Sequence, residues 1–141
     1  DLPLTLAQSV PVTGAVIVST PQPVALDDAL RAAKMYQQLG ISVLGVVENM
    51  SYFVCDGCSK EHDLFGRGGA CAAAERANLP CLGELPLSAT MRARTDAARA
   101  GENLDEPGPV AEALSAMTGA VRQAVTRRRQ QDPPPAVLRT R

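Results

Sequence analysis

The sequence lacks the features that membrane proteins and nucleic-acid-binding proteins need. No apolar run reaches the roughly 18 residues of a membrane-spanning helix, and no charged segment followed by an apolar one marks a secretory leader. The formal net charge is −1, from 14 basic and 15 acidic side chains, so no overall field attracts nucleic acid or an anionic membrane. We therefore expect a cytoplasmic protein that binds neither nucleic acid nor membranes.

The sequence also lacks internal repeats, and its 141 residues with 45% apolar content suffice for one domain. We predict an α/β domain over residues 1–128, with a C-x-x-C loop at 50–69. Three consecutive prolines between charged residues predict a disordered Arg- and Pro-rich tail at 129–141. The chain begins at Asp1 without an initiator methionine, which indicates a fragment or a processed chain.

Alternating strand and helix patterns indicate the fold class. Near-continuous apolar runs over 14–20 and 41–47 are typical of strands buried on both faces of a parallel sheet. The i, i+3, i+4, i+7 spacing over 24–39 predicts an amphipathic helix that ends at Gly40. We predict one further strand over 79–85, and helices over 70–78, 89–100 and 109–127. Ser88 caps the second of these helices and Gly101 ends it.

These elements predict an α/β layered fold with a parallel sheet. Sheets average about five or six strands, so three strands suggest that part of the domain lies upstream of the first residue.

The cysteines form one pair that is close in sequence and two that are isolated. Cys55 and Cys58 follow a strand that ends in Glu48-Asn49, and two thiolates at this spacing can bind one metal centre. We predict that Cys71 and Cys81, in a helix and a strand, are small buried hydrophobic residues, because such an apolar chain does not need a disulfide.

Two neighbouring features have alternative interpretations. His62, the only histidine, could bind zinc or donate a hydrogen bond to a metal centre, but we favour a solvated loop residue. The G-R-G-G run at 66–69 could form an anion-binding nest, but we favour a flexible loop that presents the cysteines.

Several motifs together resemble one family. The run V-V-E-N-M-S-Y-F at 46–53, the C-x-x-C pair and L-F-G-x-G-G at 64–69 closely resemble the Mrp/ApbC-type iron–sulfur carrier ATPases, which are deviant Walker P-loop proteins. The match includes L-T-L-A-Q at 4–8, T-P-Q at 20–22 and L-G-E-L-P-L at 82–87. It covers roughly residues 4–96, in the family's order.

The resemblance implies the C-terminal part of a parallel-sheet P-loop NTPase. It further implies a homodimer that holds a [4Fe–4S] cluster between subunits and passes it to apo iron–sulfur proteins, using ATP and Mg²⁺ in the intact protein. Each subunit would contribute Cys55 and Cys58, and a two-fold axis would turn two thiolates into the four that a cubane cluster takes. By the same resemblance, Asn49 would hydrogen-bond the nucleotide base, and Pro86 and Leu87 would line its pocket.

The sequence departs from the family in its phosphate-binding parts. The glycine-rich Walker A loop is absent, and neither Lys34 nor Lys60 lies in a G-x-x-x-x-G-K motif. Without that loop nothing binds the β- and γ-phosphates, so we predict that this chain alone does not hydrolyse ATP. Where relatives carry D-x-G-x-P, this chain has D-A-A-R-A at 96–100.

Other functions remain as alternatives. A non-catalytic, zinc-stabilised dimerisation or scaffold module would use the same two cysteines, because Zn²⁺ also accepts four thiolates. A thioredoxin-like role is disfavoured, because Asp56-Gly57 between the cysteines favours a turn over the start of a helix. A truncated gene product without a stable fold is the third alternative.

Overall fold

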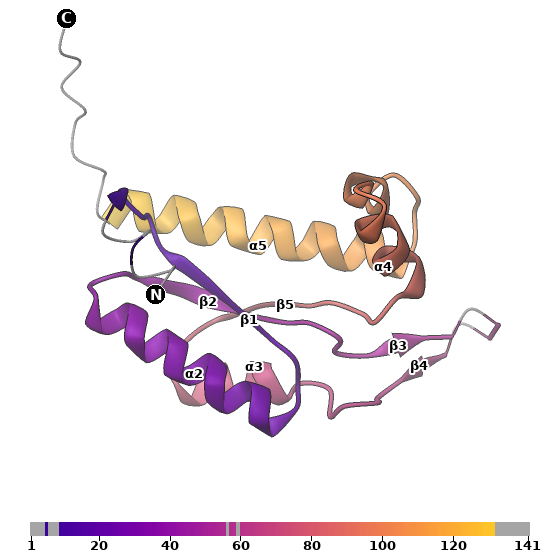
Figure 1. Cartoon of the computed structure of the whole chain (residues 1–141), viewed down its shortest axis with the longest axis horizontal. Helices are drawn as coiled ribbons and strands as arrows, with labels where there is room; N and C mark the ends of the chain where they lie inside the picture. Colours follow the sequence, from indigo (N-terminus) through magenta and orange to yellow (C-terminus); the bar gives the residue numbers. More distant parts are fainter. Residues whose placement is uncertain (1–4, 6–8, 56, 59, 132–141) are drawn as a thin grey trace, which may run out of the picture.

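The computed structural model describes residues 5, 9–55, 57, 58 and 60–131, and it has three layers (Figure 1). The middle layer is a parallel sheet with the strand order β1-β2-β5. These strands are β1 (Ala15–Ser19), β2 (Val43–Glu48) and β5 (Cys81–Glu84). The predicted α/β class with a parallel sheet is therefore confirmed.

The helices cover both faces of this sheet (Figure 1). α2 (Pro23–Gln38) and α3 (Gly69–Arg76) lie on one face, and α5 (Pro109–Gln131) crosses the other. α4 (Ala89–Asp96) and the 3₁₀ helix η1 (Ala100–Asn103) lie near the start of α5.

The alternation of side chains along β2 gives each face its own core. Val46, which pairs in register with Ile17 of β1, packs with α2 and α3. Val47 packs with Leu82 and α5. Each fully buried aliphatic side chain contributes about 1.5–3 kcal/mol. β2 is thus buried on both faces, which explains its nearly continuous apolar sequence.

The two outer strands of the sheet, β5 and β1, differ in how they are covered. A Cβ added to Gly83 would lie 3.0 Å from the Cβ of Met117, so this glycine allows α5 to approach β5 closely. Among the described residues, β1 pairs with β2 alone, and its Val18 is 60% exposed. One edge of the sheet is therefore open in this part of the chain.

The helix ends agree with the prediction at two positions and differ from it at one. Gly40 ends α2 as expected, with Ile41 N–H donating to Tyr36 O (2.9 Å) in a Schellman motif. α4 ends in the same motif, but with Ala98 in the left-handed region (φ 58°), so the predicted stop at Gly101 is wrong. The predicted Ser88 cap is confirmed by the bond from Met91 N–H to Ser88 Oγ (3.1 Å).

The C-terminal helix continues further than the sequence predicted. α5 extends to Gln131 rather than Arg127, so residues 129–131, assigned to the predicted tail, are helical. The remaining residues of that tail, 132–141, lie outside the described part of the chain.

Residues 50–69 were predicted to be a loop, but they contain a β-hairpin. β3 (Phe53–Val54) pairs antiparallel with β4 (Glu61–His62), and the two strands lead away from the three-stranded sheet (Figure 1). The strands are too short for alternation to reveal them in the sequence.

Candidate metal centre

The C-x-x-C pair lies in the connection between the two strands of this hairpin. Cys55 follows β3 directly, and its N–H donates to Lys60 O (3.0 Å), which closes the connection. Cys55 is half-buried, Cys58 is exposed, and neither is in a disulfide. Both predicted ligands therefore lie on one projecting hairpin.

The chain entering the hairpin, which we call the first stem (residues 51–54), continues the central sheet. Ser51 N–H donates to Leu85 O (2.9 Å), and Leu87 N–H donates to Tyr52 O (2.6 Å). Phe53 then forms a parallel bridge with Leu87. Backbone hydrogen bonds thus join the first stem to the segment after β5.

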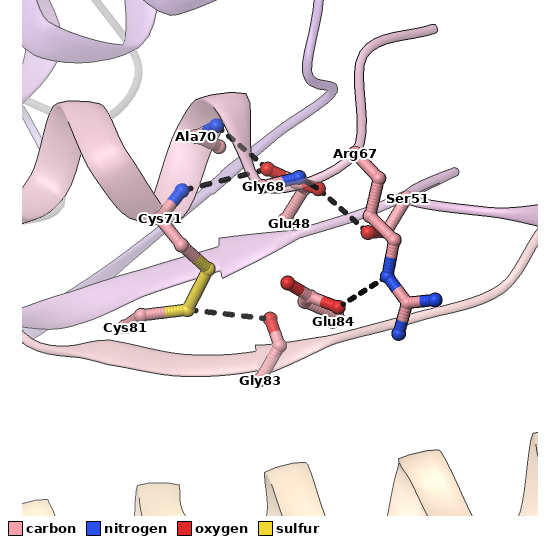
Figure 2. Close-up of a disulfide and its surroundings, with 9 residues drawn as sticks. All are labelled: Glu48, Ser51, Arg67, Gly68, Ala70, Cys71, Cys81, Gly83 and Glu84. Carbon is pink, nitrogen blue, oxygen red and sulfur yellow. Dashed lines mark hydrogen bonds and ion pairs between the residues drawn. A yellow bond between two sulfur atoms is a disulfide. The ribbon is translucent and has the colours of Figure 1, made fainter. Parts of the chain in front are cut away.

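The return stem (residues 63–68) is held mainly by side chains, of which Glu48 is the most buried. Glu48 is 0% exposed at the end of β2 (Figure 2). Its Oε1 accepts hydrogen bonds from Ser51 Oγ (2.6 Å) and Gly68 N–H (2.7 Å). Its Oε2 accepts from Ala70 N–H (2.6 Å) and, at 3.4 Å, from Cys71 N–H. The anion that the glycine-rich run binds is therefore the protein's own carboxylate.

Arg67 joins the return stem to β5. Its guanidinium binds the carboxylate of Glu84 (Figure 2). It also binds the carboxylate of Glu61 and lies 4.0 Å from the centre of the Tyr52 ring. Hydrogen bonds to Glu61 and then to Glu84 raise the pKa of Arg67 above its usual value. Burial, followed by the charge of Glu61, raises the pKa of Tyr52. The four side chains form one charged and aromatic cluster at the base of the hairpin.

The glycine-rich segment before α3 has a defined conformation. Asp63 Oδ1 accepts from Gly66 N–H (2.6 Å) and Arg67 N–H (2.9 Å), and these bonds, Arg67's first, lower the pKa of Asp63. A Cβ added to Gly69 would lie 2.7 Å from Pro21 O. The interpretation of these glycines as loop flexibility is corrected, because they allow a tight turn and a close backbone approach.

Cys71 and Cys81 form a disulfide between α3 and β5, with their Cα atoms 5.0 Å apart (Figure 2). The prediction that they are separate buried hydrophobic residues is therefore wrong. Both are half-buried rather than fully buried. Sequence reasoning failed because α3 and β5 become neighbours only through the fold.

The residues predicted to contact a nucleotide base lie near the same edge of the sheet. Pro86 and Leu87 line a cavity of about 210 Å³, which also includes Phe53 and α4. Asn49 follows β2 but does not line this cavity, and its Oδ1 accepts from Met50 N–H (2.9 Å). The structure thus brings two of the three together.

The described residues of one chain do not complete a metal site around the cysteine pair. Among the described residues no group of three or more His, Cys, Asp or Glu side chains could hold a metal ion. His62 is exposed on β4, with its ring 6.3 Å from that of Phe53.

In the part of the chain that the structure describes, none of the helices has the length and apolar character needed to cross a membrane.

Sequence reasoning did not assign roles to Glu48 or Arg67. For Glu48 a signal was present, because this acidic residue ends a run with no other charged or polar side chain. For Arg67 the signal was absent, because its partners lie 6 and 17 residues away.

Comparison with protein families gives a match over most of the chain. Residues 1–122 match the family model described as ParA: NUBPL iron-transfer P-loop NTPase. An iron–sulfur cluster carrier protein from Synechocystis sp. is 55% identical over 93 residues, which are 65% of this chain and 26% of that protein. The iron–sulfur cluster transfer protein NUBPL of Dictyostelium discoideum is 43% identical over 70% of this chain and 31% of its own length. The chain thus spans about a quarter to a third of these relatives.

Solved structures give a similar result. A nucleotide-binding protein from Archaeoglobus fulgidus, in complex with ADP, is 38% identical with a TM-score of 0.63, over 74% of this chain and 42% of that one. The cell division ATPase MinD from Pyrococcus furiosus has a TM-score of 0.58 at 18% identity, over 79% of this chain and 43% of its own, and shows the fold alone.

Proposed function

Because the chain belongs to the family of NUBPL iron-transfer P-loop NTPases, we propose that its hairpin carries an iron–sulfur cluster for delivery to apo iron–sulfur proteins. The observation that supports this most directly is the position of Cys55 and Cys58. They lie together in the connection of a projecting hairpin, and the other two cysteines are joined to each other elsewhere. Exchange of a cluster with another protein requires ligands that the recipient can reach, and Cys58 is exposed.

A second copy of the chain completes the site in this proposal. Thiolates are the usual ligands of iron–sulfur clusters, and a [4Fe–4S] cluster takes four. One chain supplies two from its hairpin, and the described residues add no third ligand. A two-fold axis beside the hairpin would bring two pairs together, because the same surface then meets itself.

ATP dependence belongs to the intact protein in this proposal. The carboxyl ends of parallel strands form the usual nucleotide edge of such sheets, and Asn49, Pro86 and Leu87 all follow strand ends there. We assign the base contacts to these residues. The phosphates and Mg²⁺ need a loop that residues 1–141 do not contain.

Anaerobic reconstitution of the 141-residue chain with iron and sulfide tests the cluster proposal. We expect cluster absorbance in the visible range, four irons and four acid-labile sulfides per two chains, and a dimer in sedimentation experiments. Cys55→Ala and Cys58→Ala should each abolish the absorbance. The matched control is the Cys71→Ala/Cys81→Ala double variant, which removes the other two sulfurs and should load normally.

Metal analysis distinguishes the zinc alternative. One zinc per two chains without acid-labile sulfide, lost in Cys55→Ala, would replace the cluster proposal with a zinc-stabilised dimer. Full cluster loading by Cys55→Ala would refute the ligand assignment itself.

A further inference from the structure

We propose that Glu48 is a positioning residue for the thiolate pair, an inference that rests on the function proposed above. Its buried carboxylate contacts both ends of the segment that carries the cysteines. Ser51 begins the first stem, and Gly68 ends the return stem. One side chain thus connects the two stems at the base of the hairpin.

The two stems differ in how much they depend on this carboxylate. The first stem also has backbone hydrogen bonds to the segment after β5: Ser51 N–H donates to Leu85 O, and Leu87 N–H donates to Tyr52 O. Among the described residues, the backbone of the return stem, which follows β4, forms no hydrogen bonds with the backbone of the central sheet. The return stem is attached to the central sheet by the hydrogen bond from Gly68 N–H to Glu48 and by the ion pair between Arg67 and Glu84. Loss of Glu48 should therefore loosen the return stem first.

Glu48, the last residue of β2, also caps the N-terminus of α3. A helix usually begins with a side chain that accepts hydrogen bonds from the second or third N–H of its first turn. Gly68 occupies the cap position of α3 and has no side chain. The Glu48 carboxylate accepts those bonds instead, from Ala70 and Cys71. Its negative charge suits the positive end of the helix dipole.

The groups around the Glu48 carboxylate are hydrogen-bond donors. Three backbone N–H groups and one hydroxyl converge on the two oxygens of Glu48, so the buried charge is fully hydrogen-bonded. In Glu48→Gln the shape is kept, but an NH₂ group replaces one oxygen. That NH₂ faces either the N–H of Ala70 or the N–H of Gly68, so one contact becomes donor against donor.

Hydrogen exchange of the full chain with reduced Cys55 and Cys58 measures the consequence without any metal. In Glu48→Gln we expect amides of residues 63–71 to exchange about tenfold faster or more. A hydrogen bond to a charged group contributes at least the free energy that corresponds to a tenfold change in the opening equilibrium. Amides of β1 and β2 should keep their protection. The control Glu75→Gln removes an exposed carboxylate from α3 and should leave all rates unchanged.

Cobalt binding measures the effect on the thiolates. Titration of the chain with Co²⁺ should show thiolate-to-cobalt absorbance, with affinity reduced about 10- to 100-fold in Glu48→Gln, as for other residues that orient metal ligands. Glu75→Gln should bind as the unmodified chain does.

The outcomes separate this proposal from the proposed function. Unchanged exchange in Glu48→Gln, or equal acceleration across β1 and β2, would refute a positioning role. If the unmodified chain binds neither cobalt nor a cluster, the proposed function fails, while exchange still decides whether Glu48 holds the hairpin. If Glu48→Gln does not fold, Ser51→Ala removes one bond to the carboxylate and should accelerate exchange in residues 51–55 alone.

Discussion

Opening the Cys71–Cys81 disulfide should lower the stability of the fold by an amount that follows from the loop it closes. The bond joins residues 10 apart in sequence, α3 to β5. The chain-entropy relation for a loop of this length gives about 2.5–3 kcal/mol at 25 °C. For 141 residues the unfolding entropy is about 0.3 kcal/mol/K, so the melting temperature should fall by about 9 °C.

The assay is urea unfolding followed by circular dichroism, with and without a phosphine reductant. The Cys71→Ala/Cys81→Ala double variant is the control, because it keeps Cys55 and Cys58 and lacks only the bond. Reductant should shift the unmodified chain to lower urea and leave the variant unchanged. Thiol labelling in native conditions should modify two cysteines before reduction and four after it.

Two results would refute this reasoning. Labelling of four cysteines without reductant would show that the bond does not form. A reductant-dependent shift of equal size in the double variant would assign the effect to the C-x-x-C pair instead.

Three further predictions concern the hairpin base and the nucleotide edge. Gly69→Ala should destabilise the fold by about 1–3 kcal/mol in urea unfolding, because its Cβ would meet Pro21 O at 2.7 Å, whereas Gly101→Ala, with open space around it, should be neutral. In a Tyr36→Phe background, absorbance titration should show Tyr52 ionising above the usual tyrosine pKa, because burial raises that pKa. The raised value contributes stability that is complete below about pH 10 and is lost as the pH rises through the folded-state pKa, so a normal tyrosine titration would contradict the burial. The purified chain should release no phosphate from ATP above a heat-killed control, and steady release would show a phosphate site that the sequence does not reveal.

The sequence was sufficient for elements whose pattern is local. The strands at 15–19 and 43–48 were predictable because almost every residue in them is apolar, which is typical of strands inside a parallel sheet. α2 was predictable because its stripe and Gly40 agree. α4 was misjudged because an Ala, rather than a Gly, adopts the left-handed conformation at its end.

Features that depend on pairing through space were not predictable. The disulfide joins cysteines whose neighbours in sequence give no sign of contact. Glu48 was recognisable as a polar residue after a buried strand, but its partners at 68–71 become adjacent only when α3 packs beside β2. For the candidate site, the C-x-x-C motif marked its position, while the groups that orient it came from the fold.

The parallel bridge between Phe53 and Leu87 has a mechanical consequence. Through it, β3, which ends directly before Cys55, extends the central sheet. Phe53 and Leu87 both line the nearby cavity, so this bridge joins the cavity wall to the strand that leads to Cys55. A change in the shape of this cavity therefore has a short backbone route to the cysteine pair, two residues beyond Phe53.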